Sequence, residues 1–83
     1  MIMHESSLMQ GMLKEIEDVR LKNKGRKVRK ITVALATFGN ITEEHFRTHF
    51  LEATQGTDIE NIKLEIQKVP FGLDARLVSV TFF

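Results

Sequence analysis

The stretch from Val28 to Thr37 constrains the fold of this chain more than any other part of the sequence. Ile31, Val33 and Leu35 alternate with small or polar residues, and a β-strand points alternate side chains to opposite faces. The pattern therefore predicts a half-buried strand whose apolar face packs against amphipathic elements. We expect it to be the first strand of a sheet and the floor of the core.

An amphipathic helix is predicted before this strand, over residues 7–23. Ser7 and Gln10 have the spacing of a capping box, and Gly25 is placed to end the helix. Apolar residues recur at helical spacing along one face: Leu8, Met9, Met12, Leu13, Ile16 and Val19. This face should cover one side of the sheet.

A second helix is predicted after the strand, beginning with Thr42 as the N-cap and ending at Gly56. Ile41 and Phe46 have the spacing of a hydrophobic staple. Three residues form the expected buried stripe: Phe46, Phe50 and Ala53.

Two further strands are predicted over residues 62–66 and 76–82. In the last strand, Val78, Val80 and Phe82 are expected to face the core. The order αβαββ predicts a two-layer α+β fold, with two helices on one face of a three-stranded mixed sheet. The 83 residues are few enough to form a single domain, 1–83.

Composition excludes several classes of function. The chain has no cysteine, which rules out disulfides, a thiolate zinc site and a cysteine nucleophile. No catalytic triad order, paired carboxylates or phosphate-binding glycine loop is evident, so we predict that the protein is not an enzyme. Without a signal peptide or a long apolar run, a cytoplasmic protein with no membrane contact is expected.

Positive charge is concentrated in residues 20–30, which contain no acidic residue. Seven of the chain's twelve basic residues lie there: Arg20, Lys22, Lys24, Arg26, Lys27, Arg29 and Lys30. The other five face all eleven acidic residues, so the rest of the chain carries a net charge of −6. This basic segment predicts either a site for an acidic partner or a solvated helix end. Nucleic acid is the less favoured partner because no aromatic residue is interleaved.

Met3-His4-Glu5 stands directly before the predicted first helix. Further blocks follow in order, namely residues 27–35, Gly56-Thr57, Leu64-Glu65-Ile66 and Val69-Pro70. Together they resemble the nickel-binding domain of the hydrogenase and urease nickel-insertion proteins, the HypA/HybF family, from Met3 to about Pro70.

The resemblance implies that His4 is a nickel ligand, surrounded by the backbone of Met3 and Glu5. A neutral imidazole suits Ni²⁺, and Glu5 is expected either to orient it or to contact the metal. Two residues, Met1 and Ile2, precede the motif and displace the terminal amine, which the family also uses. Without the resemblance, the alternative for His4 is a solvated side chain near a terminus.

The resemblance also implies a non-enzymatic, metallochaperone-like accessory protein for hydrogenase maturation or nickel-enzyme assembly. Its partner would be a maturation protein, with a GTPase as the family's example. The family carries a zinc domain with paired Cys-x-x-Cys motifs after the strand that ends near Pro70. Here a short loop leads directly to the last strand, so the zinc domain is missing and no zinc is expected.

His45 and His49 form a second candidate metal site that owes nothing to the resemblance. Their spacing puts both imidazoles on one side of the second helix, with Glu44 nearby. The alternative for His49 is half-buried packing beside Phe46 and Phe50.

A self-associating protein, most simply a homodimer, is predicted from the sheet face away from the helices. Four apolar residues are expected there: Ala34, Ala36, Leu77 and Phe83. Exposed apolar strips often mark interfaces. The alternative is a monomer in which Lys30, Glu65 and Gln67 cover the strip.

Overall fold

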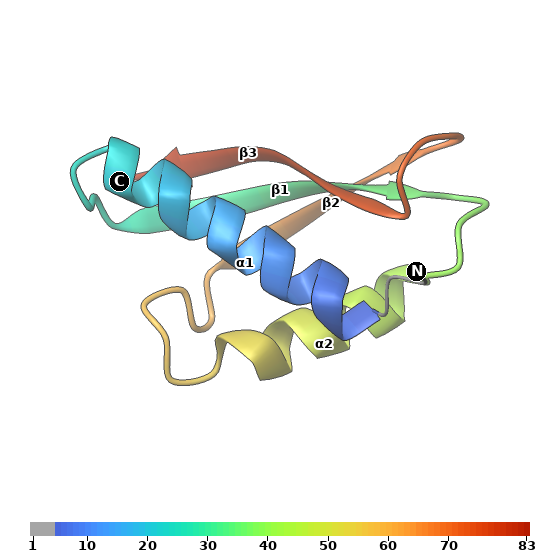
Figure 1. Cartoon of the computed structure of the whole chain (residues 1–83), viewed down its shortest axis with the longest axis horizontal. Coiled ribbons are helices and arrows are strands. Elements are labelled where there is room, and N and C mark those ends of the chain that lie inside the picture. The colour runs from blue at the N-terminus through green and yellow to red at the C-terminus, as the bar shows by residue number, and fades with distance from the viewer. Residues whose placement is uncertain (1–4) are drawn as a thin grey trace.

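Among the residues that the structure describes, the elements follow the order α1 (Glu5–Lys22), β1 (Val28–Ala36), α2 (Glu43–Thr54), β2 (Lys63–Val69) and β3 (Ala75–Phe82). The computed structural model describes the backbone of residues 5–83 and the side chains of residues 7–83. Both helices lie on one side of the sheet (Figure 1). The predicted α+β fold of order αβαββ is confirmed. In this described part, neither helix is long and apolar enough to cross a membrane.

β1 is the central strand, with β2 parallel on one side and β3 antiparallel on the other. Its Ile31 pairs with Leu64 of β2 and Val80 of β3, so these apolar residues share one face. Ile31, Val33 and Leu35 are almost completely buried. The prediction that this strand forms the floor of the core is therefore confirmed.

α1 contributes Met9, Met12 and Ile16 to the core, as its apolar periodicity predicts. The expected capping box at Ser7 is wrong, because the helix already begins at Glu5 and Ser7 lies inside its first turns. An acidic residue at a helix start is favoured by the macrodipole. The helix ends as predicted near Gly25, which has a φ of 67° and donates from its amide to the Arg20 carbonyl at 2.9 Å.

α2 begins at the predicted cap, where the Thr42 hydroxyl accepts a hydrogen bond from the His45 amide at 3.1 Å. Phe46 and Phe50 are buried against the sheet. The expected burial of Ala53 is wrong, because the stripe advances by four residues and buries Thr54 instead. The Thr54 hydroxyl donates to the Phe50 carbonyl at 2.8 Å, which satisfies its polar group inside the core.

β3 contains a β-bulge that the sequence pattern does not reveal. Thr32 pairs with Ser79 and the next residue, Val33, pairs with Leu77, so Val78 is the extra residue. The bulge exchanges the two faces of the strand along its length. Val80 and Phe82 pack against the core as predicted, but the inward position expected for Val78 is wrong. Val78 is 41% exposed, and Leu77 packs against the core in its place.

The open face of the sheet is more polar than predicted. Leu77 lies on the helix side, and Phe83 lies beyond the end of β3. Ala34 is buried in register between Gln67 and Arg76, two long polar side chains on the flanking strands. The four-residue apolar strip is therefore absent, which removes the reason for a dimer through this face. Self-association itself stays a prediction.

Candidate metal and partner-binding sites

The predicted nickel ligand, His4, and its neighbour Met3 lie outside the described residues. Glu5 is described as the first residue of α1, without its side chain. The Met3-His4-Glu5 motif therefore runs directly into the helix, as the family resemblance implies. The buried Met9 and Met12 anchor that helix to the core less than two turns later.

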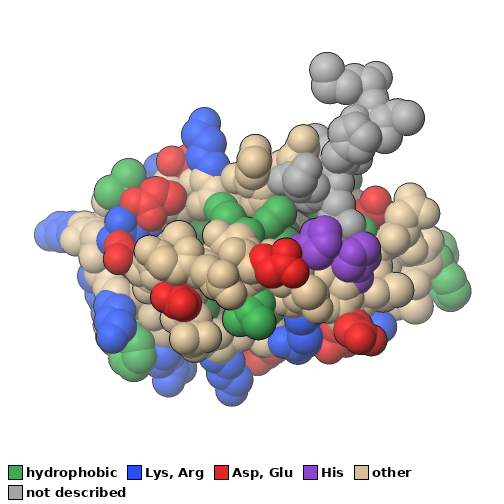
Figure 2. Space-filling view, turned by 90° about the horizontal axis from the view of Figure 1, so that it is seen from below, with side chains coloured by type: hydrophobic (Ala, Val, Ile, Leu, Met, Phe, Trp, Pro, Cys, Tyr) green, Lys and Arg blue, Asp and Glu red, His purple; other side chains and the backbone are tan. Residues whose placement is uncertain are grey.

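The structure brings His45 and His49 together on the outer side of α2. Their ring centroids are 4.4 Å apart and the ring planes meet at 76°. His45 is exposed and His49 is half-buried. Figure 2 shows the two side chains next to each other at the surface. The predicted grouping of these two imidazoles on one side of the helix is present.

An open hollow surrounds the two histidines. Its lining residues are Thr42, Glu44, His45, Thr48, His49 and Glu52. Two carboxylates thus share the hollow with the imidazoles and make it favourable for a cation. Within the described residues, no three His, Cys, Asp or Glu side chains are arranged to hold a metal ion together. Two imidazoles are therefore the strongest described donor set.

Four cations of the basic segment are engaged within the fold. Arg20 pairs with Glu17, and Lys30 pairs with Glu65 across the sheet at 3.4 Å. Arg26 donates to the Phe83 carbonyl and lies over the Phe82 ring, 5.7 Å from its centroid. Lys27 lies 5.6 Å from the centroid of the Phe83 ring. Part of the segment thus joins the end of β3 to the start of β1.

The other three cations, Lys22, Lys24 and Arg29, form no ion pair with a carboxylate of the described residues. All three are exposed, and they lie at the end of α1, in the following turn and on β1. Any acidic partner of this segment would meet these three charges first. An aromatic ring is also present here, because Phe83 is 67% exposed beside Lys27.

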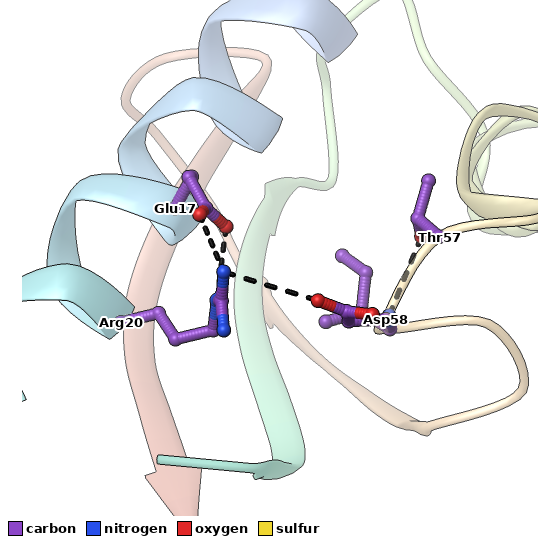
Figure 3. Close-up of polar contacts among 5 residues, drawn as sticks. Glu17, Arg20, Thr57 and Asp58 are labelled. Carbon is purple, nitrogen blue, oxygen red and sulfur yellow. Dashed lines mark hydrogen bonds and ion pairs between the residues drawn. The ribbon is translucent and has the colours of Figure 1, made fainter. Parts of the chain in front are cut away.

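An Arg20 bridge between α1 and the loop after α2 was missed by sequence reasoning. Arg20 donates to both Glu17 oxygens, at 3.0 and 2.6 Å, and its guanidinium lies 3.9 Å from Asp58 (Figure 3). The hydrogen bond from Arg20 lowers the pKa of Glu17, and the same bond raises the pKa of Arg20. Asp58 is 38 positions from Arg20 in the chain, so no local pattern could have paired them.

The family model described as hydrogenase/urease nickel incorporation, metallochaperone, HypA matches residues 3–76 of the chain. That match covers most of the 83 residues and includes Met3-His4-Glu5. The chain belongs to the HypA family. The resemblance inferred from the sequence is thereby confirmed.

Curated relatives carry the name hydrogenase maturation factor HypA. The protein from Lawsonia intracellularis is 35% identical over 71 residues, covering 86% of this chain and 60% of the relative. The protein from Methylocella silvestris is 36% identical over 67 residues, covering 81% of this chain and 59% of the relative. This chain thus spans about three-fifths of the length of the curated HypA proteins that it matches.

A solved structure shares the fold of this HypA-family chain. It is the solution structure of the Ni metallochaperone HypA from Helicobacter pylori, with a TM-score of 0.80. The alignment covers 96% of this chain and 97% of the other, at 16% sequence identity. At that identity the comparison supports the αβαββ architecture alone.

Proposed function

We propose that this chain is a non-catalytic nickel-binding accessory protein, which binds Ni²⁺ through His4 and passes it on during nickel-enzyme assembly. The observation that carries the proposal is the family match, which begins at Met3 and so includes the Met3-His4-Glu5 motif. Relatives named as hydrogenase maturation factors make hydrogenase the first candidate for the recipient enzyme.

The proposed ligands are the His4 imidazole and main-chain nitrogens of Met3, His4 and Glu5. Nitrogen donors in a square-planar arrangement suit Ni²⁺. Because the sequence contains no cysteine, this chain offers the ion no thiolate. We therefore propose a nitrogen-donor site for Ni²⁺ and no structural zinc in this chain.

Delivery requires a second protein that accepts the ion. We propose a maturation protein, of which a GTPase is the example that the resemblance supplies, meeting this chain in the cytoplasm. α1 supports such a role, because its buried Met9, Met12 and Ile16 hold the helix that follows His4. The metal-binding motif is thus attached to a rigid element rather than to a long loop.

Titration of the full chain with Ni²⁺ tests this proposal, with calorimetry as the readout. His4→Ala should weaken the nickel affinity at His4 at least about tenfold, because a metal ligand is lost. Gln10→Ala, an exposed change on α1, is the matched control and should leave the affinity unchanged. Equal affinities in wild type and His4→Ala, or binding in neither, would refute the proposal.

A second candidate function is binding of an acidic partner or nucleic acid by residues 20–30. It is favoured by the unpaired Lys22, Lys24 and Arg29 and by the exposed Phe83 ring beside Lys27. An exposed ring next to cations is typical of single-strand binding surfaces.

Salt dependence tests the nucleic-acid form of this candidate. Affinity for a single-stranded 20-nucleotide probe should fall with salt, with a log–log slope of about −0.7 per phosphate neutralised. The double variant Lys22→Ala, Lys24→Ala should make that slope shallower by about 2. Absence of binding at low salt, or binding that does not respond to salt, excludes nucleic acid as the partner.

A further inference from the structure

The histidine pair of α2 is a group of metal-ligating side chains that the proposed His4 site does not use. We propose that His45 and His49 together bind one divalent transition-metal ion of the Ni²⁺ class, at a second position on this chain. The binding is argued from the described residues alone. Its role in handling nickel rests on the proposed function.

The backbone holds the two histidines in place. The Thr42 hydroxyl accepts the His45 amide and fixes the first turn of α2, and His49 follows one turn later. The ring centroids are 4.4 Å apart. Two imidazoles bound side by side to one ion, with metal–nitrogen bonds of about 2.0–2.1 Å, require a separation of about 4–5 Å. Little rearrangement of α2 is therefore needed for both rings to reach one ion.

Core packing does not account for the pair. The buried face of α2 is formed by Phe46, Phe50 and Thr54, whereas His45 is exposed and His49 is only half-buried. Both line the open hollow (Figure 2). A hydrated ion can therefore approach the pair from solvent without opening the fold.

Charge in the hollow also favours a cation. Glu44 and Glu52 line it together with the histidines. The nearby cation on α2, Arg47, is engaged elsewhere, because it donates to Glu43 at 3.1 Å and to the Leu64 carbonyl at 3.0 Å. The electrostatic field at the pair is thus set by two carboxylates.

The chemistry of the pair is binding without hydrolysis. Two histidines four residues apart on a helix also hold zinc in the His-Glu-x-x-His metalloproteases, whose glutamate is the general base. Here the corresponding residue is Phe46, which is buried. Two protein ligands leave the remaining positions on the ion to water or to another molecule. Such a site loads and unloads readily, which suits an ion in transit.

The test uses the full chain carrying His4→Ala, titrated with Ni²⁺ alone. This protein should still bind one ion, with an affinity that His45→Ala or His49→Ala weakens at least about tenfold, because the second imidazole no longer acts at high effective concentration. Thr48→Ala, in the same hollow, is the matched control and should leave the affinity unchanged. Paramagnetic broadening by Ni²⁺ should be strongest at the two imidazoles.

Two results would overturn the inference. In one, the His4→Ala protein binds no Ni²⁺. In the other, its affinity is the same with and without the two histidines. His45→Gln and His49→Gln, which keep polar side chains of similar size, serve if the alanine variants unfold. The proposed function fails separately, because it predicts that the double variant His45→Ala, His49→Ala keeps a nickel site that depends on His4.

Discussion

α2 and β3 differ in how directly their sequences determine their structures. In α2, the cap at Thr42 and the buried Phe46 and Phe50 all lie where the sequence predicts. In β3, strict alternation places Val78 in the core, whereas the structure exposes it and packs Leu77 instead. Helix signals are set by residues within a turn or two of one another. The facing of an edge strand depends on its pairing with a distant strand.

The bulge in β3 is the physical origin of this difference. Register shifts between Thr32 and Val33 let one β1 step span two residues of β3. Leu77 and Val80 are three apart in sequence, yet both pack against the core. A strand read without its partner cannot reveal such a change of face.

Substitutions in β3 give the largest expected effect and can break the comparison. Leu77→Ala should lower the free energy of unfolding by about 2 kcal/mol, because it removes a partly buried apolar side chain. Val78→Ala should cost about 0.5 kcal/mol or less, since its side chain is largely in solvent. Urea unfolding of both variants measures the difference.

Strict alternation predicts the opposite order for these two variants. A larger loss for Val78→Ala than for Leu77→Ala would mean that β3 has no bulge at this position. Ser79→Ala, whose side chain lies on the open face in register with Thr32, serves as a control with little expected change.

Removal of the α2 cap gives a smaller effect and sharpens the comparison. Thr42→Ala should lower the free energy of unfolding by about 1 kcal/mol, because the His45 amide loses its acceptor. Thr42→Ser keeps the hydroxyl and should retain most of the stability. If both variants match wild type in thermal unfolding, the start of α2 is held by packing of Ile41 and Phe46 rather than by the cap.

Most of the fold could be predicted because its signals are local. The periodicity of α1 and the alternation of β1 depend on neighbouring residues, and both elements are present. The errors occurred where tertiary context decides. Thr54 is buried in place of Ala53 because the buried stripe of α2 advances four residues at a time along the sheet.

The candidate sites divide in the same way. The spacing of His45 and His49 was enough to place both imidazoles together. The pairing of Arg20 with Asp58, and of Arg26 with the end of β3, joins segments far apart in the chain and left no trace in the sequence. The HypA family is confirmed, whereas nickel binding by His4 stays a prediction because that residue lies outside the described structure.

The connection between β2 and β3 is fastened to the end of β1 at both of its ends. The Val69 carbonyl accepts from the Thr37 amide at 2.7 Å, and the Asp74 carbonyl accepts from the Ala36 amide at 3.1 Å. The residues between these clamps are exposed. Chain of any length can therefore be spliced in there without changing a strand pair. The sheet and helices form a chassis whose cargo at this point is a separate evolutionary choice.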